Sequence, residues 1–216
     1  MPLWKRQKIQ KLLWAFIIGL PLFFSPANAQ ITLYGGYSPS IPLSQQWLDY
    51  VDKYPANEGM LAIEFPATGS LNWHFEGGFA SLPKGGALES GNIKWLGAGM
   101  MIRKDFAGSF DVGLGPQIIY GFATAKGTVS WNDSDTIIAF DGSATGFGIG
   151  INVGADYKIT DHLFCGLSFG IVYFGISEAS IPIVGHNNSE SSDSTHYLYT
   201  GEYISLSPRI VVGYEF

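Results

Sequence analysis

The stretch Ile210-Val-Val-Gly-Tyr-Glu-Phe216 closes the chain and carries an apolar side chain at every second position. Alternation with a period of two is typical of a β-strand that has one apolar face. The last residues of a soluble chain are usually polar and frayed. The pattern therefore predicts that the final strand, down to Phe216 itself, belongs to the fold.

Seven earlier segments alternate in the same way, at residues 30–37, 60–65, 71–79, 93–102, 110–122, 145–157 and 163–173. In the third of these, Trp73 and Phe75 share one face, while His74 and Glu76 share the other. In segment 93–102 the sequence does not decide whether the odd or the even positions face outward, because both carry apolar side chains. Together with the last strand, which begins at about Tyr203, the pattern predicts eight strands.

The second face of these strands is small or polar. Between the apolar residues of segment 145–157 lie four glycines, Asn152 and Asp156. In a soluble sandwich this face would meet water and would usually be rich in long polar side chains, whereas a narrow barrel interior needs small ones. An outer face toward lipid and a filled polar lumen explain both patterns. We therefore predict an all-β fold, an eight-stranded antiparallel up-and-down transmembrane β-barrel.

The connections between the predicted strands alternate in length. Short ones lie at residues 66–70, 103–109 and 158–161, and long ones at 38–59, 81–92, around 132–135 and 176–197. Short periplasmic turns and long extracellular loops are the layout of outer-membrane barrels. An even number of strands places both ends of the barrel on the short-turn side, and closure leaves no strand edge unpaired in lipid.

The N-terminus has the three parts of a secretory signal peptide. Basic residues precede an apolar run from Leu12 to Phe24, and the small-residue site Ala27-Asn-Ala29 follows. The 13 residues of this run are fewer than the roughly 20 that a membrane-spanning helix needs. We predict cleavage after Ala29, so that residues 1–29 are a signal peptide and residues 30–216 form the barrel.

Charge and cysteine content narrow the function further. Cleavage removes four basic residues and changes the formal net charge from −6 to −10. This charge argues against nucleic acid as a partner and suits acidic surface loops. Cys165 is the only cysteine of the sequence, so no intrachain disulfide is possible. Its position on the apolar face indicates a small lipid-facing side chain.

On these features the chain resembles the small eight-stranded outer-membrane barrels of the OmpA/OmpX-like kind. The matching features are the signal peptide, the turn Tyr157-Lys-Ile-Thr-Asp-His-Leu163 and the ending at residues 210–216. The resemblance covers essentially all of the mature chain and implies a monomer in the lipid of the cell outer membrane. It also implies an assembly signal, read by the barrel-assembly machinery, at Ile210, Val212, Tyr214 and Phe216.

Side-chain parity places a group of charged residues in the lumen. Arg209 lies on the polar face of the last strand, and a guanidinium at this depth requires a carboxylate partner. We expect Glu76 as its first partner, with Glu64 and Asp111 behind it. His74 lies on the same face as Glu76, because residues two apart on a strand point the same way. The interpretation is a structural polar cluster that holds the barrel closed.

Two other functions use the same residues. His74 and Glu76 could form an acid–base pair or, with Ser168 or Ser207 as nucleophile, part of a catalytic constellation in a lipid-modifying enzyme. A ring of lumen charges could instead select ions in a narrow channel. The chain contains no catalytic motif, and eight strands leave an interior just wide enough for side chains. The prediction is therefore a protein without enzymatic activity, cofactor or metal.

The long connections are the expected contact surface. Residues 43–54 carry apolar side chains at helical spacing and predict a short amphipathic helix at the barrel mouth. Residues 186–196 are rich in serine and asparagine and predict a polar surface loop. The predicted function is a surface protein whose four long loops contribute to envelope integrity, adhesion or contact with an extracellular ligand or host surface.

Overall fold

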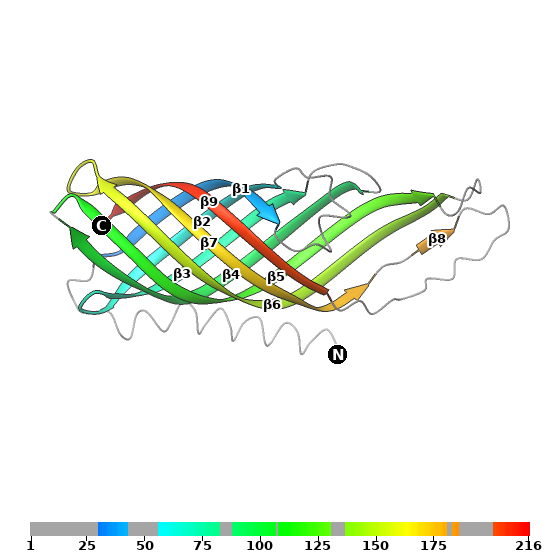
Figure 1. Cartoon of the computed structure of the whole chain (residues 1–216), viewed down its shortest axis with the longest axis horizontal. Coiled ribbons are helices and arrows are strands. Elements are labelled where there is room, and N and C mark those ends of the chain that lie inside the picture. Colours follow the sequence, from blue (N-terminus) through cyan, green and yellow to red (C-terminus); the bar gives the residue numbers. More distant parts are fainter. Residues whose placement is uncertain are drawn as a thin grey trace.

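The structure is a computed structural model of the chain (Figure 1), and it describes residues 30–42, 56–82, 88–106, 108–130, 137–180, 183–185 and 201–216. The predicted signal peptide, helix 43–54, tip 132–135 and loop 186–196 lie outside these residues. The strands are β1 (Thr32–Pro42), β2 (Ala56–Thr68), β3 (Leu71–Leu82), β4 (Leu88–Phe106), β5 (Phe110–Ser130), β6 (Ile137–Lys158), β7 (Leu163–Ser180), β8 (Ile183–Gly185) and β9 (Gly201–Glu215).

Eight of these strands form a closed antiparallel barrel. Each strand from β1 to β7 pairs with the next, and β9 pairs with both β7 and β1 to close the ring. The ninth strand, β8, lies outside the ring and adds to β6 at Ala139 and its neighbours. The predicted eight-stranded up-and-down barrel is therefore confirmed. Among the described residues, no helix has the length and hydropathy needed to cross a membrane.

An apolar belt surrounds the barrel. On β5 it runs from Phe110 to Phe122, and on β6 from Tyr157 to Phe147; the side chains at alternate positions are exposed, except for the half-buried Val112 and Ala155. The span from Phe110 to Phe122, at about 3.3 Å per residue along a strand tilted by about 40°, rises about 30 Å, the thickness of the hydrocarbon core of a bilayer. Aromatic rings lie at both ends of the belt, as they do in transmembrane barrels.

The phase of the ambiguous strand is now clear. In β4, Ile102 is 55% exposed and faces outward, whereas Met101 is 4% exposed and faces the lumen. Even positions of β4 therefore meet lipid, and odd positions fill the interior. The sequence is ambiguous here because Trp95 and Met101 are apolar residues that fill the lumen.

The inner end of the barrel carries the short turns, and the C-terminus lies at this end (Figure 1). Gly69 and Gly108 occupy these turns with φ of 54° and 73°, a backbone conformation that glycine adopts without strain. The sequence predicts a turn between β4 and β5 that begins at Arg103, but β4 continues to Phe106. That prediction is wrong because the two charges of Arg103-Lys104 resemble a turn, although they lie on opposite faces of a strand.

At the outer end, the strands continue beyond the membrane. β5 and β6 remain paired as far as Ser130↔Ile137, and Figure 1 shows this hairpin rising past its neighbours. The predicted loops 38–59 and 81–92 are too long, because β1 to β4 extend into them and leave connections at residues 43–55 and 83–87. On the outward face of the hairpin, Lys126 and Asp141 pair at 2.7 Å, and this contact raises the pKa of Lys126.

Candidate functional site

The middle of the lumen holds a connected cluster of charged side chains, called the lumen cluster below. Its members are Glu58, Glu64, His74, Glu76, Arg103, Asp156 and Arg209. They come from five strands, β2, β3, β4, β6 and β9, and they extend along the lumen from Glu58 toward the outer end to Asp156 toward the inner end.

Arg209 anchors the outer half of the lumen cluster. Its Nη2 lies 2.9 Å from Glu58 Oε1, and its Nη1 lies 3.3 Å from Glu76 Oε2. Its Nε also donates to Glu58 Oε1 at 3.0 Å. Arg209 is 3% exposed, and its guanidinium bridges β2 and β3 from the last strand of the barrel.

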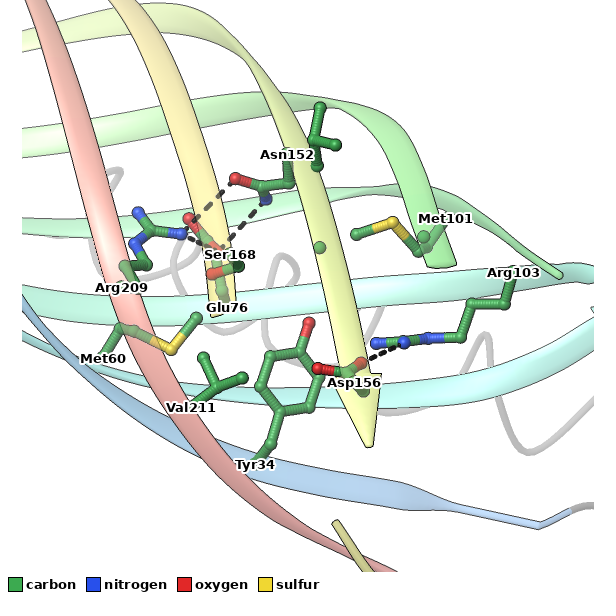
Figure 2. Close-up of a pocket in the computed structure, with 13 residues that line it drawn as sticks. Tyr34, Met60, Glu76, Met101, Arg103, Asn152, Asp156, Ser168, Arg209 and Val211 are labelled. Atoms are coloured by element: carbon green, nitrogen blue, oxygen red, sulfur yellow. Dashed lines mark hydrogen bonds and ion pairs between the residues drawn. The ribbon is translucent and has the colours of Figure 1, made fainter. Parts of the chain in front are cut away.

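Arg103 anchors the inner half. Its Nε and Nη2 donate to the two oxygens of Glu64 at 2.6 and 2.8 Å, which is the bidentate arrangement of a strong ion pair. Its Nη1 donates to Asp156 Oδ2. Figure 2 shows Arg103 reaching toward Asp156 across the lumen.

His74 joins the two halves. Its Nδ1 lies 3.3 Å from Glu64, and its Nε2 lies 3.3 Å from Glu76. Tyr34 donates its hydroxyl to Glu64 at 2.9 Å and lies 3.0 Å from the same ring nitrogen. Both nitrogens of the imidazole therefore face hydrogen-bonding oxygen atoms, and the ring is held from both sides.

Neutral amides complete the coordination of the carboxylates. Asn152 donates to Glu76 Oε2 at 3.3 Å (Figure 2). Gln117 donates to Glu76 Oε1 at 2.9 Å. Asn72 donates to Glu64 at 3.2 Å. Buried charges are tolerated when they are paired and hydrogen-bonded, and removing one partner is strongly destabilising.

Apolar side chains cover the cluster on its outer side. Toward the outer end, Trp95 packs against Ala80 and Leu82, and its indole lies over Gly78, where a Cβ would overlap the ring. A cavity of about 20 Å³ remains beside the cluster. A cavity needs about 10–15 Å³ to hold one water, so this space fits a water molecule rather than a solute.

The structure places most of the predicted site residues together. Glu64, His74, Glu76 and Arg209 belong to the lumen cluster, and Arg209 contacts Glu76 as its sequence position suggested. Asp111 lies apart at the inner end, where it pairs with Lys158 at 3.2 Å. The prediction that Asp111 could be a partner of Arg209 is therefore wrong.

Sequence reasoning misses two members of the lumen cluster. It assigns Glu58 to a loop and Arg103 to a turn, although both lie on strands that are longer than predicted. The parity of neighbouring residues contains the signal: Glu58 shares its parity with Glu64, and Arg103 shares its parity with Met101.

The structure does not assemble the catalytic constellation that the sequence left open. The hydroxyl of Ser207 donates to Glu58 at 2.8 Å, so its proton is directed away from His74. The buried Oγ of Ser168 has no hydrogen-bond partner among the described residues. Both nitrogens of His74 face carboxylates instead. Within the described part of the chain, no group of three metal-binding side chains is arranged to hold an ion.

The residues of the predicted assembly signal lie together on the outside of β9. Ile210, Val212, Tyr214 and Phe216 all face outward. The rings of Tyr214 and Phe216 are 4.9 Å apart, and His162 stacks on Tyr214 at 5.6 Å. The amide of Phe216 donates to the carbonyl of Ile31 at 2.9 Å, so the last residue helps to close the ring.

Two solved structures share this architecture. Neisserial surface protein A matches with a TM-score of 0.55 at 13% identity, over 87% of this chain and 97% of that one. A major outer membrane protein from Thermus thermophilus matches with a TM-score of 0.55 at 17% identity, over 87% of this chain and 99% of that one. No protein-family model matches the chain, and no curated protein matches its sequence. The chain therefore has the fold of the small eight-stranded outer-membrane barrels.

Proposed function

We propose that this chain is a non-enzymatic integral protein of the outer membrane that presents a surface to the cell exterior. The apolar belt supports a membrane location, because its height matches the hydrocarbon core. The barrel fold shared with outer-membrane proteins supports the outer membrane in particular. A protein of this type contributes to envelope integrity, adhesion or contact with an extracellular ligand or host surface.

The filled lumen is the observation that carries this proposal. Ion pairs and amides occupy the centre, and Trp95 with its neighbours covers them from the outer side. A channel for solutes needs a continuous path, and the cavity beside Arg209 fits one water. An enzyme that modifies lipid needs a nucleophile within reach of a base, and His74 is instead held between two carboxylates.

The hairpin of β5 and β6 is the proposed contact element. It continues for eight residues past Phe122, to Ser130, which is about 26 Å along the strand at about 3.3 Å per residue. Polar side chains on its outward face pair across strands, with Lys126 at 2.7 Å from Asp141 and Thr128 at 3.3 Å from Glu89. These cross-strand pairs support a rigid extension that holds its tip away from the lipid.

Shortening this hairpin tests the contact function. Residues 128–139 are removed, and Gly127 is joined to Phe140 through an Asn-Gly turn, which suits two residues that are cross-strand partners. We expect normal amounts of folded barrel in the membrane and a loss of cell attachment to the surfaces or host cells that the wild type binds. The matched control, Lys126→Gln, keeps the hairpin and should keep attachment. Attachment that survives the deletion would contradict the role of the hairpin.

Two measurements on the same strains separate the other functions. Lipid A from a deletion strain should have the wild-type mass spectrum, and a lost acyl or sugar modification would indicate an enzyme. The purified barrel should give no conductance steps in a planar bilayer, and regular steps would indicate a channel.

A further inference from the structure

The seam that closes the barrel is interrupted. Pairs between β1 and β9 are continuous from the inner end as far as Tyr37↔Ile210, and they resume only at Ile41↔Leu206. Residues 38–40 of β1 therefore have no ladder partner on β9. The gap lies within the barrel wall and not at a frayed strand end, because pairing continues on both sides of it.

Two prolines explain the gap. The register of the flanking pairs sets Pro39 of β1 opposite Pro208 of β9. Residues that face each other at a hydrogen-bonded position of an antiparallel ladder exchange two N–H···O bonds. Proline has no N–H, so both bonds are absent at this position. The pairs on either side of a hydrogen-bonded position depend on the same two bonds, which accounts for the loss of three consecutive pairs.

The interruption at Pro39 and Pro208 affects only the pairing between β1 and β9. On their other sides, Pro39 still pairs with Asn57 of β2, and Pro208 still pairs with Phe169 of β7. Pro116 also interrupts the ladder between β4 and β5, but the residue opposite it is not a proline. The β4–β5 ladder therefore loses one N–H donor, whereas the β1–β9 ladder loses two. In lipid a backbone carbonyl without a donor is strongly unfavourable, so barrels normally avoid such a position.

The gap lies in the outer half of the bilayer. Pro208 stands eight residues before Phe216, which is a rise of about 20 Å at about 3.3 Å per residue along a strand tilted by about 40°. Next to the gap, the side chains of Tyr37 and Ile210 point away from the lumen. They are 58% and 65% exposed and face lipid. The gap therefore opens toward acyl chains and not toward water.

Polar groups lie directly behind the gap. Ser38 is fully buried, and its Oγ has no hydrogen-bond partner among the described residues. On the other strand, Ser207 and Arg209 face inward and both contact Glu58. Only the interrupted part of the barrel wall thus separates these polar groups from lipid. They are the hydroxyl of Ser38, the carboxylate of Glu58 and the guanidinium of Arg209.

We propose that the barrel opens sideways at Pro39 and Pro208, as a port through which an amphiphile of the outer leaflet brings its polar head to Glu58, Ser38 and Arg209. The acyl chain of such a molecule matches the apolar rim at Tyr37 and Ile210. A head that both donates and accepts hydrogen bonds matches the carboxylate and the guanidinium behind the gap. This port is a lateral one, and the barrel remains sealed along its axis.

Hydrogen exchange in lipid nanodiscs tests whether the seam opens. Hydrogen-bonded pairs alternate along the ladder, so the amides of Tyr37 and Ile210 point across the seam, and those of Ser207 and Arg209 point to β7. The amides of Ser207 and Arg209 are therefore the control, because they lie on β9 on either side of Pro208. We expect the seam amides to exchange at least about tenfold faster than the control amides in the wild type.

Restoring the missing donors should close the port. The variant Pro39→Thr with Pro208→Thr supplies both N–H groups, and either single variant supplies one. We expect the seam amides to slow to the rate of the control amides in the double variant and to an intermediate rate in the single variants. Equal exchange at seam and control positions in the wild type, or fast seam exchange that persists in the double variant, would overturn the proposal.

A photoreactive lipid tests the ligand class. The probe is a single-chain phospholipid with a diazirine next to its headgroup, incorporated in the nanodisc and activated by light, with adducts mapped by mass spectrometry. We expect adducts on the lumen-facing residues Ser38 and Glu58, reduced at least about tenfold in the double variant, and none on Val211, a buried residue of β9 below the gap. Adducts only on outward residues such as Tyr37, or equal labelling of Val211, would overturn the port.

Discussion

Arg209 and Glu58 are 151 residues apart in the chain, yet two guanidinium nitrogens of Arg209 lie 2.9 and 3.0 Å from the same carboxylate oxygen of Glu58. The contact joins β9 to β2 across β1, which lies between them in the sheet. It therefore links the two sides of the closing seam through the lumen, at the depth where the backbone ladder is interrupted. Side chains hold the barrel together where the backbone contributes least.

Replacing Arg209 should destabilise the barrel. Arg209→Met leaves Glu58 and Glu76 without their shared cation, and breaking a buried pair typically costs about 3–5 kcal/mol. We expect a lower unfolding temperature in detergent, measured by circular dichroism and by heat-dependent migration in gels. Adding Glu58→Gln should recover part of the loss, and more than adding Glu64→Gln, because Glu64 is held by Arg103. An unchanged unfolding temperature in Arg209→Met would contradict this account of the lumen cluster.

Gly78 should be intolerant of a side chain. Its missing Cβ makes room for the Trp95 indole, so Gly78→Ala forces the ring away from its packing against Ala80 and Leu82. We expect a loss of about 1–3 kcal/mol, the usual range for overpacking. Gly59→Ala is the matched control, since nothing lies within 4 Å of its added Cβ. Equal unfolding temperatures for the two variants would show that Trp95 has room to move.

Removal of Phe216 should impair membrane insertion. The residue contributes the last hydrogen bond of the closing seam, to Ile31, and packs its ring against Tyr214. The resemblance to outer-membrane barrels further implies that this aromatic end is read during assembly. We expect the truncated chain to accumulate in the periplasm on cell fractionation, whereas Phe216→Tyr should insert normally. Wild-type amounts of the truncated chain in the membrane would contradict the role of Phe216 in assembly.

Protease treatment of intact cells should cut the chain between residues 187 and 194. This serine-rich stretch lies between β8 and β9 in sequence, and the alternation of short and long connections predicts that it is extracellular. Mass spectrometry of the fragments locates the cut. Cleavage that occurs only after the cells are broken open would mean that the barrel has the reverse orientation.

Side-chain parity is the part of the fold that sequence predicts well. Because lipid and lumen impose opposite demands on successive residues, Arg209 and Glu76 can be placed inside the barrel without a structure. Parity does not reveal where a strand ends. Glu58 lies on β2 two residues before Met60, where the alternating segment of the sequence begins, and nothing in the sequence there marks the start of the strand.

Contacts across the lumen are less accessible from sequence. Sequence separation does not indicate which inward residues meet, because closure brings β9 next to β1 and the shear of the barrel sets their relative heights. Arg103 illustrates the difficulty, because its sequence context resembles a turn. Only the register shows that it reaches Glu64 of β2 and Asp156 of β6.

Because the two ends of the barrel lie next to each other, the folding of the barrel and its delivery to the membrane can be studied separately. Ile31 and Phe216 are already joined by a backbone hydrogen bond, so a short linker could connect residue 216 to residue 30 without disturbing any ladder pair. Cutting the same chain between β1 and β2 would produce a circular permutant with an unchanged barrel, whose last residue is no longer aromatic and whose new ends lie outside the cell. Refolding of that permutant in detergent would report on the barrel alone. Its delivery in living cells would report on how far the export pathway depends on the position of an aromatic residue at the physical end of a polypeptide.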